Sequence, residues 1–272
     1  MVEIKKISVV SIVDKGTRFY ITALKCFMYQ TYQNTEWLII DNTGSGILKA
    51  KLEKYIIKDE RIRVISNMVP RTKSDVLKQA FELATGNYIA FLNPSDYWVS
   101  DKLARQTGFM LRYKASLSHT SYGFADDGCH LLPIGCYHIQ KDLNMLNYSL
   151  KNPVSLSTLM ISKDALIDFS KFEMSSDSDE MMFFLKTGLV SSGMSDVLTL
   201  CRPIFDEDTR AELEKMIASV SAQNPNAADI TLRVLEHHAH AALNVEGLKL
   251  DPTICIGYDV IASLTKLRNY KI

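Results

Sequence analysis

Short, continuously apolar runs alternate with longer segments of helical periodicity along the first hundred residues. The first run, ISVVSIV, is rich in β-branched residues, which is typical of a strand buried on both faces of a parallel sheet. The pattern predicts strands at 7–13, 36–41, 62–66 and 88–92, separated by helices at 19–31, 48–57 and 73–84. Gly86 is predicted to cap the third helix. Four strand–helix units with short connections indicate an α/β fold with a doubly wound, mostly parallel sheet.

The pattern changes after residue 98, where we predict a more antiparallel region. The expected elements are a helix at 101–113, strands at 119–123, 130–139, 155–161 and 197–201, and a short helix at 180–186. From about residue 205 the periodicity is helical. We therefore predict two parts, an α/β domain at 1–204 and a helical C-terminal extension at 205–272.

Composition narrows the class of protein. The 272 residues include 31 basic and 31 acidic side chains, so the formal net charge is zero and no nucleic-acid partner is expected. The five cysteines form no Cys-x-x-Cys pair, which favours reduced thiols in a cytoplasmic protein. The sequence shows neither a signal-peptide pattern nor a run of about 20 apolar residues that could span a bilayer. We expect a cytoplasmic location, and peripheral contact with the inner face of the cell membrane stays open.

Polar residues follow the predicted parallel strands at the points where the strands end. Ligands of open α/β sheets bind beyond the carboxyl ends of the strands. This rule places Val13 and Asp14, then Asp41, and then the turn Asn93–Asp96 at one edge of the sheet, where a nucleotide could bind.

Several segments match one known family in order and spacing. They read ISVVSIV, KCFMYQTYQNTEWLIIDN, ATGNYIAFLNPSDYWVSDKL, SLKNPVSLSTLMISKDAL and SDSDEMMFFLKTG. Over about residues 5–202 the chain resembles the family 2 glycosyltransferases that build bacterial surface polysaccharides. The resemblance implies the GT-A fold, a metal-dependent transfer of sugar from a nucleotide donor, and inversion at the transferred carbon.

The resemblance also implies roles for individual residues. Asp41 takes the position of the aspartate that accepts a ring N–H of the nucleotide base, usually uracil. Asn93–Asp96 takes the position of the acidic turn that holds a divalent cation against the diphosphate. Asp177 takes the position of the base that deprotonates the acceptor hydroxyl, with Asp179 close to the same register.

Three positions depart from the family pattern. The first strand ends in Ile12-Val13-Asp14-Lys15 where the family usually has Pro-x-Tyr-Asn, and Leu77-Lys78 replaces an Arg-Asn pair. The usual Asp-x-Asp has become Asn93-Pro94-Ser95-Asp96. Because Mg²⁺ and Mn²⁺ prefer carboxylate oxygens, the implied cation would be held by Asp96, with Ser95 and Asn93 offering only neutral oxygens.

Each candidate residue also has a structural interpretation. Asp177 could cap the helix that begins near residue 180, and Asp41 could form an Asx-turn. Asp96 could cap the turn before Tyr97-Trp98. Lys78 could neutralise phosphate as a point charge or could be a solvated helix lysine.

We predict an inverting glycosyltransferase that moves a sugar from a nucleotide donor, most simply a UDP-sugar, to a lipid-linked or oligosaccharide acceptor. Homodimerisation and membrane docking are both open roles for residues 205–272. Two alternatives remain at this stage. One is a degenerate, non-catalytic GT-A domain that serves as a binding or scaffold module. The other is a nucleotidyltransferase, for which Asp14–Arg18 would have to form the phosphate loop.

Overall fold

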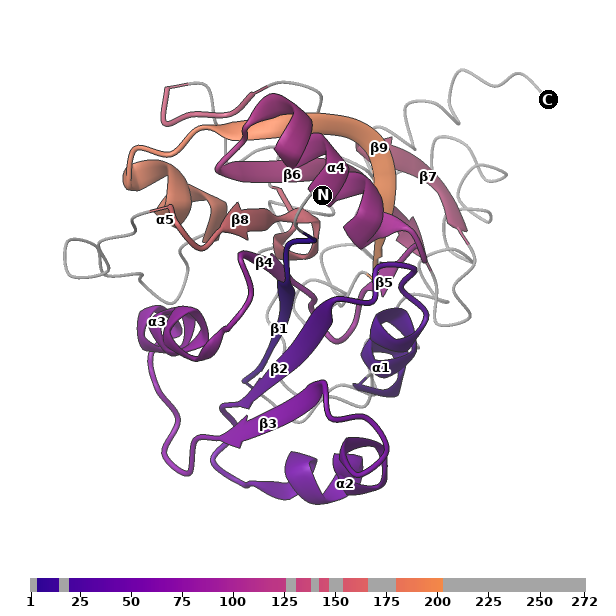
Figure 1. Cartoon of the computed structure of the whole chain (residues 1–272), viewed down its shortest axis with the longest axis vertical. Coiled ribbons are helices and arrows are strands. Elements are labelled where there is room, and N and C mark those ends of the chain that lie inside the picture. The colour runs from indigo at the N-terminus through magenta and orange to yellow at the C-terminus, as the bar shows by residue number, and fades with distance from the viewer. Residues whose placement is uncertain are drawn as a thin grey trace, which may run out of the picture. The chain divides into compact units, whose positions relative to one another are not determined.

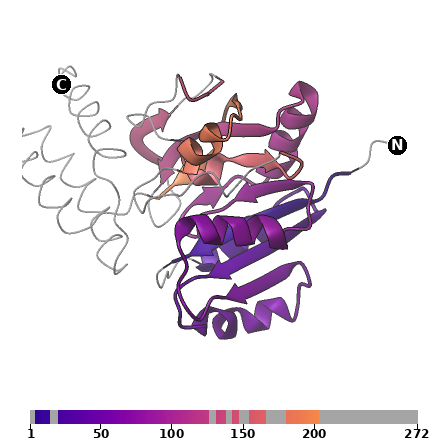
Figure 2. The same ribbon diagram turned by 90° about the vertical axis from the view of Figure 1, so that its left-hand side faces the viewer.

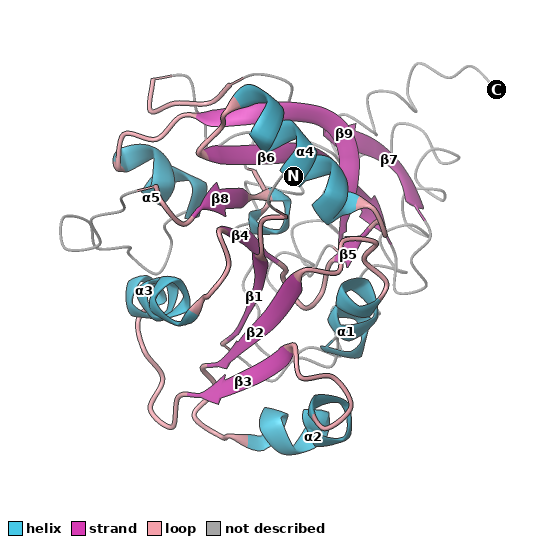
Figure 3. Cartoon of the chain, in the orientation of Figure 1, coloured by secondary structure: helices cyan, strands magenta, loops and turns pink. Residues whose placement is uncertain are grey.

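The computed structural model describes residues 4–14, 20–125, 131–137, 142–146, 154–165 and 180–202. Nine strands in this part of the chain form one sheet, whose main path runs β3-β2-β1-β4-β8-β6-β9-β5, with β7 paired to β6. Figure 1 labels these elements, and Figure 3 shows how strands and helices alternate along the first part of the chain.

The first four strands of the path form its parallel half, as predicted from their apolar runs. Register pairs run from Ile7↔Thr35 to Val13↔Asp41 between β1 and β2, and from Trp37↔Ile62 to Asp41↔Ser66 between β2 and β3. The elements of this half are β1 (Ile7–Val13), α1 (Tyr20–Met28), β2 (Thr35–Asp41), α2 (Ile47–Ile56), β3 (Ile62–Ser66), α3 (Lys73–Leu83) and β4 (Tyr88–Phe91).

The remaining strands continue the sheet with antiparallel pairings, of β8 with β4 and β6 and of β5 with β9. In the view of Figure 2 these magenta to orange strands lie above the indigo and purple parallel strands. The elements are β5 (Tyr97–Trp98), α4 (Lys102–Tyr113), β6 (Leu117–Ala125), β7 (Leu131–Tyr137), the 3₁₀ helix η1 (Leu156–Thr158), β8 (Met160–Ser162), α5 (Glu180–Lys186) and β9 (Ser191–Cys201).

Helices cover both faces of the parallel strands, which explains why these strands are continuously apolar. On one face, Val10 and Leu38 pack in a cluster with Leu77 of α3 and Phe184 of α5. On the other face, Trp37 packs with residues of α1, α2 and α4, and its ring stacks on Phe27 at 5.5 Å between centroids. Figure 1 shows α1 and α3 on opposite sides of β1 and β2. The predicted α/β architecture, with helices on both faces of the parallel strands, is confirmed.

Two sequence expectations are corrected. The segment 155–161 is not one strand, because its first half is the 3₁₀ helix η1 and only Met160–Ser162 forms β8. Serine and threonine hydrogen bonds cause this: Ser155 Oγ accepts from Ser157 N, and Thr158 Oγ1 donates to Ser155 O at 2.7 Å. Gly86 also does not cap α3, which ends at Leu83 with Ala84 as its C-cap. A Cβ at Gly86 would lie 2.6 Å from Ser8 N, so glycine permits a close approach to β1.

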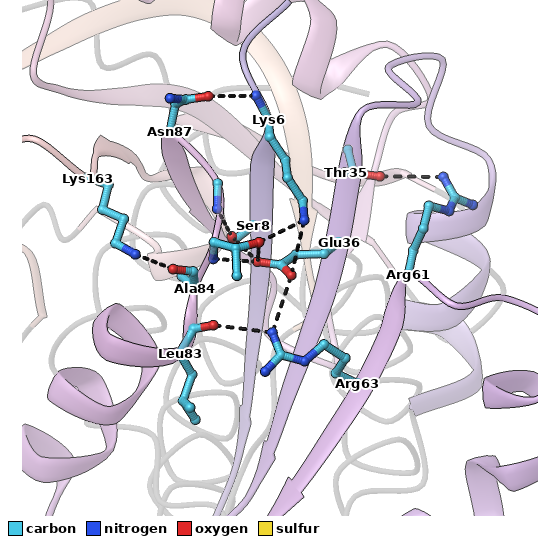
Figure 4. A network of polar contacts seen from close by, with 12 residues as sticks. Lys6, Ser8, Thr35, Glu36, Arg61, Arg63, Leu83, Ala84, Asn87 and Lys163 are labelled. Carbon is cyan, nitrogen blue, oxygen red and sulfur yellow. Dashed lines mark hydrogen bonds and ion pairs between the residues drawn. The ribbon is translucent and has the colours of Figure 1, made fainter.

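A buried carboxylate ties the amino ends of the parallel strands together (Figure 4). Glu36 on β2 accepts from Ser8 Oγ at 2.6 Å and from Thr85 N at 2.7 Å, and it lies 3.4 Å from the cations of both Lys6 and Arg63. Burial alone would raise the pKa of Glu36, but the hydrogen bonds from Ser8 and Thr85 and the charge of Lys6 lower it to about 2. This cluster lies at the end of the strands opposite the predicted ligand edge, so we assign it to stability.

The chain divides into two compact units. The first contains the parallel strands and comprises Met1–Gly123, Cys136–Tyr148 and Val154–Cys201. The second comprises Phe124–Gly135, Ser149–Pro153 and Arg202–Ile272, and most of it lies outside the described residues. The predicted helical extension at 205–272 also lies outside them, so it stays a prediction. Among the described helices, none is long and apolar enough to cross a membrane.

Candidate functional site

Three register partners form a row at the carboxyl ends of the parallel strands. Val13, Asp41 and Ser66 are paired across β1, β2 and β3. Side chains of partners in a parallel pair point to the same face, and strand alternation puts Asp41 on the face of Trp37 and Ile39, which is the face covered by α1 and α2. The edge predicted from sequence therefore exists, and Val13 and Asp41 lie side by side on it.

Asp41 is fully buried, and among the described residues only one of its two carboxylate oxygens has a hydrogen-bond partner. Oδ1 accepts from the backbone N of Thr43 at 3.1 Å and from Thr43 Oγ1 at 2.6 Å, which is the Asx-turn considered above. Oδ2 is buried and has no hydrogen-bond partner in the described part of the chain, and the same holds for the buried Oγ of Ser66. Buried polar atoms are normally paired, so two such atoms on register partners make this row the candidate site for a polar ligand.

A second row is formed by the residues that follow the first row along the chain, Asp14, Asn42 and Asn67. Hydrogen bonds between their side chains link them. Asn42 donates to Asp14 Oδ1 at 2.9 Å and accepts from Asn67 Nδ2 at 3.2 Å. Asn67 and Gln79 of α3 then exchange two amide hydrogen bonds, of 2.9 and 3.0 Å. The second row fastens the ends of β1, β2 and β3 to α3. The second row therefore holds the strand ends of the candidate site in position, and Asp14 takes part by accepting the hydrogen bond from Asn42.

The turn Asn93–Asp96 begins beside β1, where Leu92 N donates to Val10 O at 2.8 Å. Asn93 Oδ1 accepts from both N and Oγ of Ser95, at 3.1 and 2.8 Å, so these side chains hold the turn closed. Asp96 is 4% exposed, and its Oδ2 accepts a 2.5 Å hydrogen bond from Ser157 Oγ. Sequence analysis did not identify Ser157, which lies 61 residues from Asp96 along the chain.

Lys78 lies on the exposed surface of α3 and lines a polar depression of about 360 Å³. The other lining residues are Arg71, Asp75, Gln79 and Glu82. Since Gln79 of α3 also bonds to Asn67 of the second row, the depression adjoins the ligand edge. Its two basic side chains could offset phosphate charge, although Asp75 and Glu82 reduce the local positive charge.

Lys102 is a fully buried charged group whose burial the sequence did not reveal. It is 0% exposed, its Nζ lies 4.6 Å from the centroid of the Trp98 ring, and it donates to Gln106 Oε1 at 2.5 Å. Burial lowers the pKa of Lys102 to about 7. Lys102 follows the turn 93–96 and supports Trp98, whose ring N–H donates to Ser157 O.

The residues of the turn can be compared with the needs of a divalent cation. No cluster of three or more His, Cys, Asp and Glu side chains suited to a metal occurs in the described ranges. Asp96 is the single carboxylate of the turn. Mg²⁺ is commonly held by one or two carboxylates together with substrate phosphates and water. The turn therefore fits a cation that binds together with a phosphate ligand, but not a cation held by protein alone.

The structure thus brings Val13, Asp14 and Asp41 together at one edge, with the turn of Asn93, Ser95 and Asp96 beginning beside β1. Asp177 lies outside the described residues, in the segment before α5. Besides Lys102, sequence reasoning missed Ser66, Asn67 and Ser157. The sequence did hold one signal for Ser66 and Asn67. They stand at the end of a predicted strand and directly after it, as Asp41 and Asn42 do.

Comparison with known sequences identifies relatives of this chain. The family model described as glycosyl transferase family 2 matches residues 21–153. A putative teichuronic acid biosynthesis glycosyltransferase, TuaG of Bacillus subtilis, is 29% identical over 62% of this chain and 68% of its own length. The UDP-Glc:alpha-D-GlcNAc-diphosphoundecaprenol beta-1,3-glucosyltransferase WfaP of Escherichia coli is 36% identical over 36% of this chain and 38% of its own length. Coverage of the curated relatives is therefore partial.

Two solved structures share the fold. Staphylococcus aureus TarS 1–349 in complex with UDP-GlcNAc has a TM-score of 0.58 and 15% identity, covering 79% of this chain and 66% of that one. The mannosyltransferase PcManGT of Pyrobaculum calidifontis, in complex with GDP-Man and Mn²⁺, has a TM-score of 0.56 and 13% identity, covering 100% and 77%. At these identities the likeness establishes the architecture alone.

Proposed function

The chain carries a family 2 glycosyltransferase domain with the GT-A fold, and from this premise we propose that it is an active, inverting transferase of bacterial surface-polysaccharide synthesis. The donor is a nucleotide sugar, most simply a UDP-sugar. The nucleotide lies along the carboxyl ends of β1, β2 and β3, and its diphosphate reaches the turn Asn93–Asp96.

The observation that carries this proposal is the unused Oδ2 of Asp41. A buried carboxylate with an oxygen that lacks a partner among the described residues is costly unless a ligand supplies a donor. The N3–H of uracil is such a donor, and the two carbonyl groups that flank it need donors in return. We propose that Ser66 on the neighbouring strand, whose buried hydroxyl has no partner among the described residues, supplies one of them.

The diphosphate requires compensation of its negative charge. We propose that Asp96 would hold a divalent cation, Mg²⁺ or Mn²⁺, with Ser95 and Asn93 offering neutral oxygens beside it. When bound, this cation offsets charge that develops on the leaving diphosphate. Lys78 lies on the edge of the neighbouring depression and could add a long-range positive charge.

Inversion needs one in-line displacement and one general base. The acceptor hydroxyl attacks the anomeric carbon from the face opposite the diphosphate, and a carboxylate takes its proton. We propose Asp177 as this base, on the basis of its register within SDSDEMMFFLKTG. The proton leaves the acceptor oxygen for Asp177, and the C–O bond to the diphosphate breaks as the new glycosidic bond forms.

The acceptor is proposed to be a lipid-linked saccharide. The name of WfaP specifies a GlcNAc-diphosphoundecaprenol acceptor, and that of TuaG specifies teichuronic acid biosynthesis. Such an acceptor would bring the enzyme to the inner face of the cell membrane, and residues 205–272 are then available for membrane docking or for a homodimer contact. A degenerate, non-catalytic domain is the less favoured alternative, because the relatives in the comparison are named as transferases.

Isothermal titration with UDP, CDP and GDP, each with and without Mn²⁺, tests the donor site. We expect selective UDP binding that Mn²⁺ strengthens at least tenfold, because a cation held at Asp96 would offset the charge of the diphosphate. Absence of binding to all three nucleotides would contradict the proposal and favour the scaffold alternative. Selective UDP binding would justify a screen of UDP-sugars as donors.

A further inference from the structure

We infer that Ser157 is a positioning residue for the donor site, which holds the carboxylate of Asp96 in the orientation that a nucleotide-bound divalent cation needs. The inference rests on the proposed function, because it concerns the turn that would hold this cation. Ser157 comes from η1, far along the chain from the turn, and it is 0% exposed.

A single hydroxyl group contacts both ends of the turn. Ser157 Oγ accepts from the backbone N of Asn93 at 2.9 Å and donates to Asp96 Oδ2 at 2.5 Å. A hydroxyl has one donor and two acceptor positions, so both bonds can form at once. A short O–H···O⁻ bond to a carboxylate is among the stronger and more directional hydrogen bonds in proteins. The rotation of the Asp96 carboxylate is therefore restrained relative to the start of the turn.

Ser157 is itself held in place by neighbouring elements. Its carbonyl oxygen accepts from the ring N–H of Trp98 in β5 at 2.8 Å and from Thr199 Oγ1 in β9 at 3.1 Å. Its backbone N bonds to Ser155 Oγ within η1. The hydroxyl is thus attached to a fixed backbone, which is the arrangement that a preorganised site needs.

The composition of the turn explains why this restraint would affect binding. The side chains of Asn93 and Ser95 bond to each other, and Asp96 supplies the turn's single carboxylate. With two carboxylates, the misorientation of one could be compensated by the other. With one, the affinity for the cation depends on the orientation of Asp96, and that orientation depends on Ser157.

The test compares Ser157→Ala with Thr199→Val by isothermal titration of UDP with and without Mn²⁺. Ser157→Ala removes both hydrogen bonds of the Ser157 hydroxyl, whereas Thr199→Val removes one bond to the Ser157 carbonyl and leaves the bond between Ser157 and Asp96 intact. We expect Ser157→Ala to lose at least tenfold of the Mn²⁺ enhancement, with metal-free UDP affinity within about twofold of wild type. Thr199→Val should keep both quantities, because the shorter bond from the Trp98 ring N–H still holds the Ser157 carbonyl. Ser157→Thr, which retains the hydroxyl, should restore the enhancement.

Full Mn²⁺ enhancement in Ser157→Ala, or an equal loss in Thr199→Val, would overturn the inference and reduce Ser157 to a structural residue. If Ser157→Ala does not fold, Ser157→Cys replaces it, since a thiol is of similar size but a weak donor, and partial loss is expected. UDP binding by the wild type without any response to Mn²⁺ would refute the inference while leaving the donor site standing. No nucleotide binding by the wild type would refute the proposed function itself.

Discussion

Asp41 and Ser66 are register partners at the carboxyl ends of β2 and β3, and each has a buried oxygen with no hydrogen-bond partner among the residues that the structure describes. Neighbouring strands lie about 4.8 Å apart, so the two groups can contact adjacent atoms of one ring. Asp41 presents an acceptor, whereas the hydroxyl of Ser66 can donate or accept. This pair complements an N–H beside a carbonyl group, which uracil presents and cytosine does not.

Replacing Asp41 by Asn should reverse the preference for the base. The asparagine Oδ1 can keep both bonds to Thr43, while its NH₂ group takes the place of Oδ2. That group is a donor, so it cannot pair with the N3–H donor of uracil, but it can donate to the N3 acceptor of cytosine. A hydrogen bond to a charged group contributes roughly 1.5–3 kcal/mol, so UDP affinity should fall about 10- to 100-fold. CDP affinity should fall less or rise, as measured by titration. An unchanged ratio of UDP to CDP affinity would place the base elsewhere.

Replacing Ser66 by Ala should weaken UDP and CDP binding alike, because a hydroxyl can serve either base. One neutral hydrogen bond contributes about 1 kcal/mol, which corresponds to roughly a fivefold loss. Thr120→Val is the matched control, because Thr120 on β6 also has a buried hydroxyl without a partner in the described part of the chain. This control should leave both affinities unchanged. Equal losses in the two variants would indicate a general effect on the sheet.

Replacing Asp177 by Asn should abolish sugar transfer and leave UDP binding nearly intact. A general base contributes about 10²- to 10⁴-fold to rate, and an amide cannot take the proton of the acceptor hydroxyl. The measurement is transfer from the UDP-sugar that the donor screen identifies, with titration of UDP alongside. Asp179→Asn is the control, since it removes a carboxylate two residues away. Full activity of Asp177→Asn, or loss in Asp179→Asn alone, would exclude Asp177 as the base.

The fold and one edge of the site were predictable because they depend on local patterns. Apolar runs set the parallel strands, and the rule for strand ends then placed Asp41 and Asp96 at one edge. The long-range contacts were not predictable. Ser66 is relevant because strand register places it beside Asp41. Ser157 accepts a hydrogen bond from the backbone N of Asn93, which lies 64 residues away along the chain. The helical spacing of 101–113 also gives no sign that Lys102 is fully buried, because that depends on tertiary packing.

Replacing Glu36 by Gln should lower the melting temperature by several degrees at neutral pH. The variant removes charge-assisted hydrogen bonds of roughly 1.5–3 kcal/mol each, and 1 kcal/mol corresponds to about 2–4 °C in a domain of this size. The pKa of Glu36 is about 2 in the folded protein, below the ordinary value of 4.5, so its stabilisation is present above pH 4.5 and is lost as pH falls toward 2. The melting curves of variant and wild type should therefore converge in acid.

Glu82→Gln serves as the control for this experiment, because Glu82 is exposed on α3. It should leave the melting temperature within about 1 °C of wild type, as expected for a surface change. A constant difference between Glu36→Gln and wild type down to pH 2 would show that the stabilisation comes from packing and not from the charge of Glu36.

Replacing Lys102 by Met should flatten the rise of stability with pH between about 7 and 10. Burial lowers the pKa of Lys102 to about 7, whereas an unfolded lysine has a pKa near 10.4. Between these values the unfolded chain binds more protons, so the free energy of unfolding increases with pH by up to about 1.4 kcal/mol per unit. Methionine cannot titrate and removes this contribution.

Since the substitution also leaves Gln106 Oε1 without its donor, the test is the slope of stability against pH and not the absolute stability. Denaturant titrations at pH 7, 8.5 and 10 measure it, with the exposed Lys58→Met as control. Equal slopes in Lys102→Met and wild type would show that the ammonium stays charged in the fold, held by the Trp98 ring and Gln106.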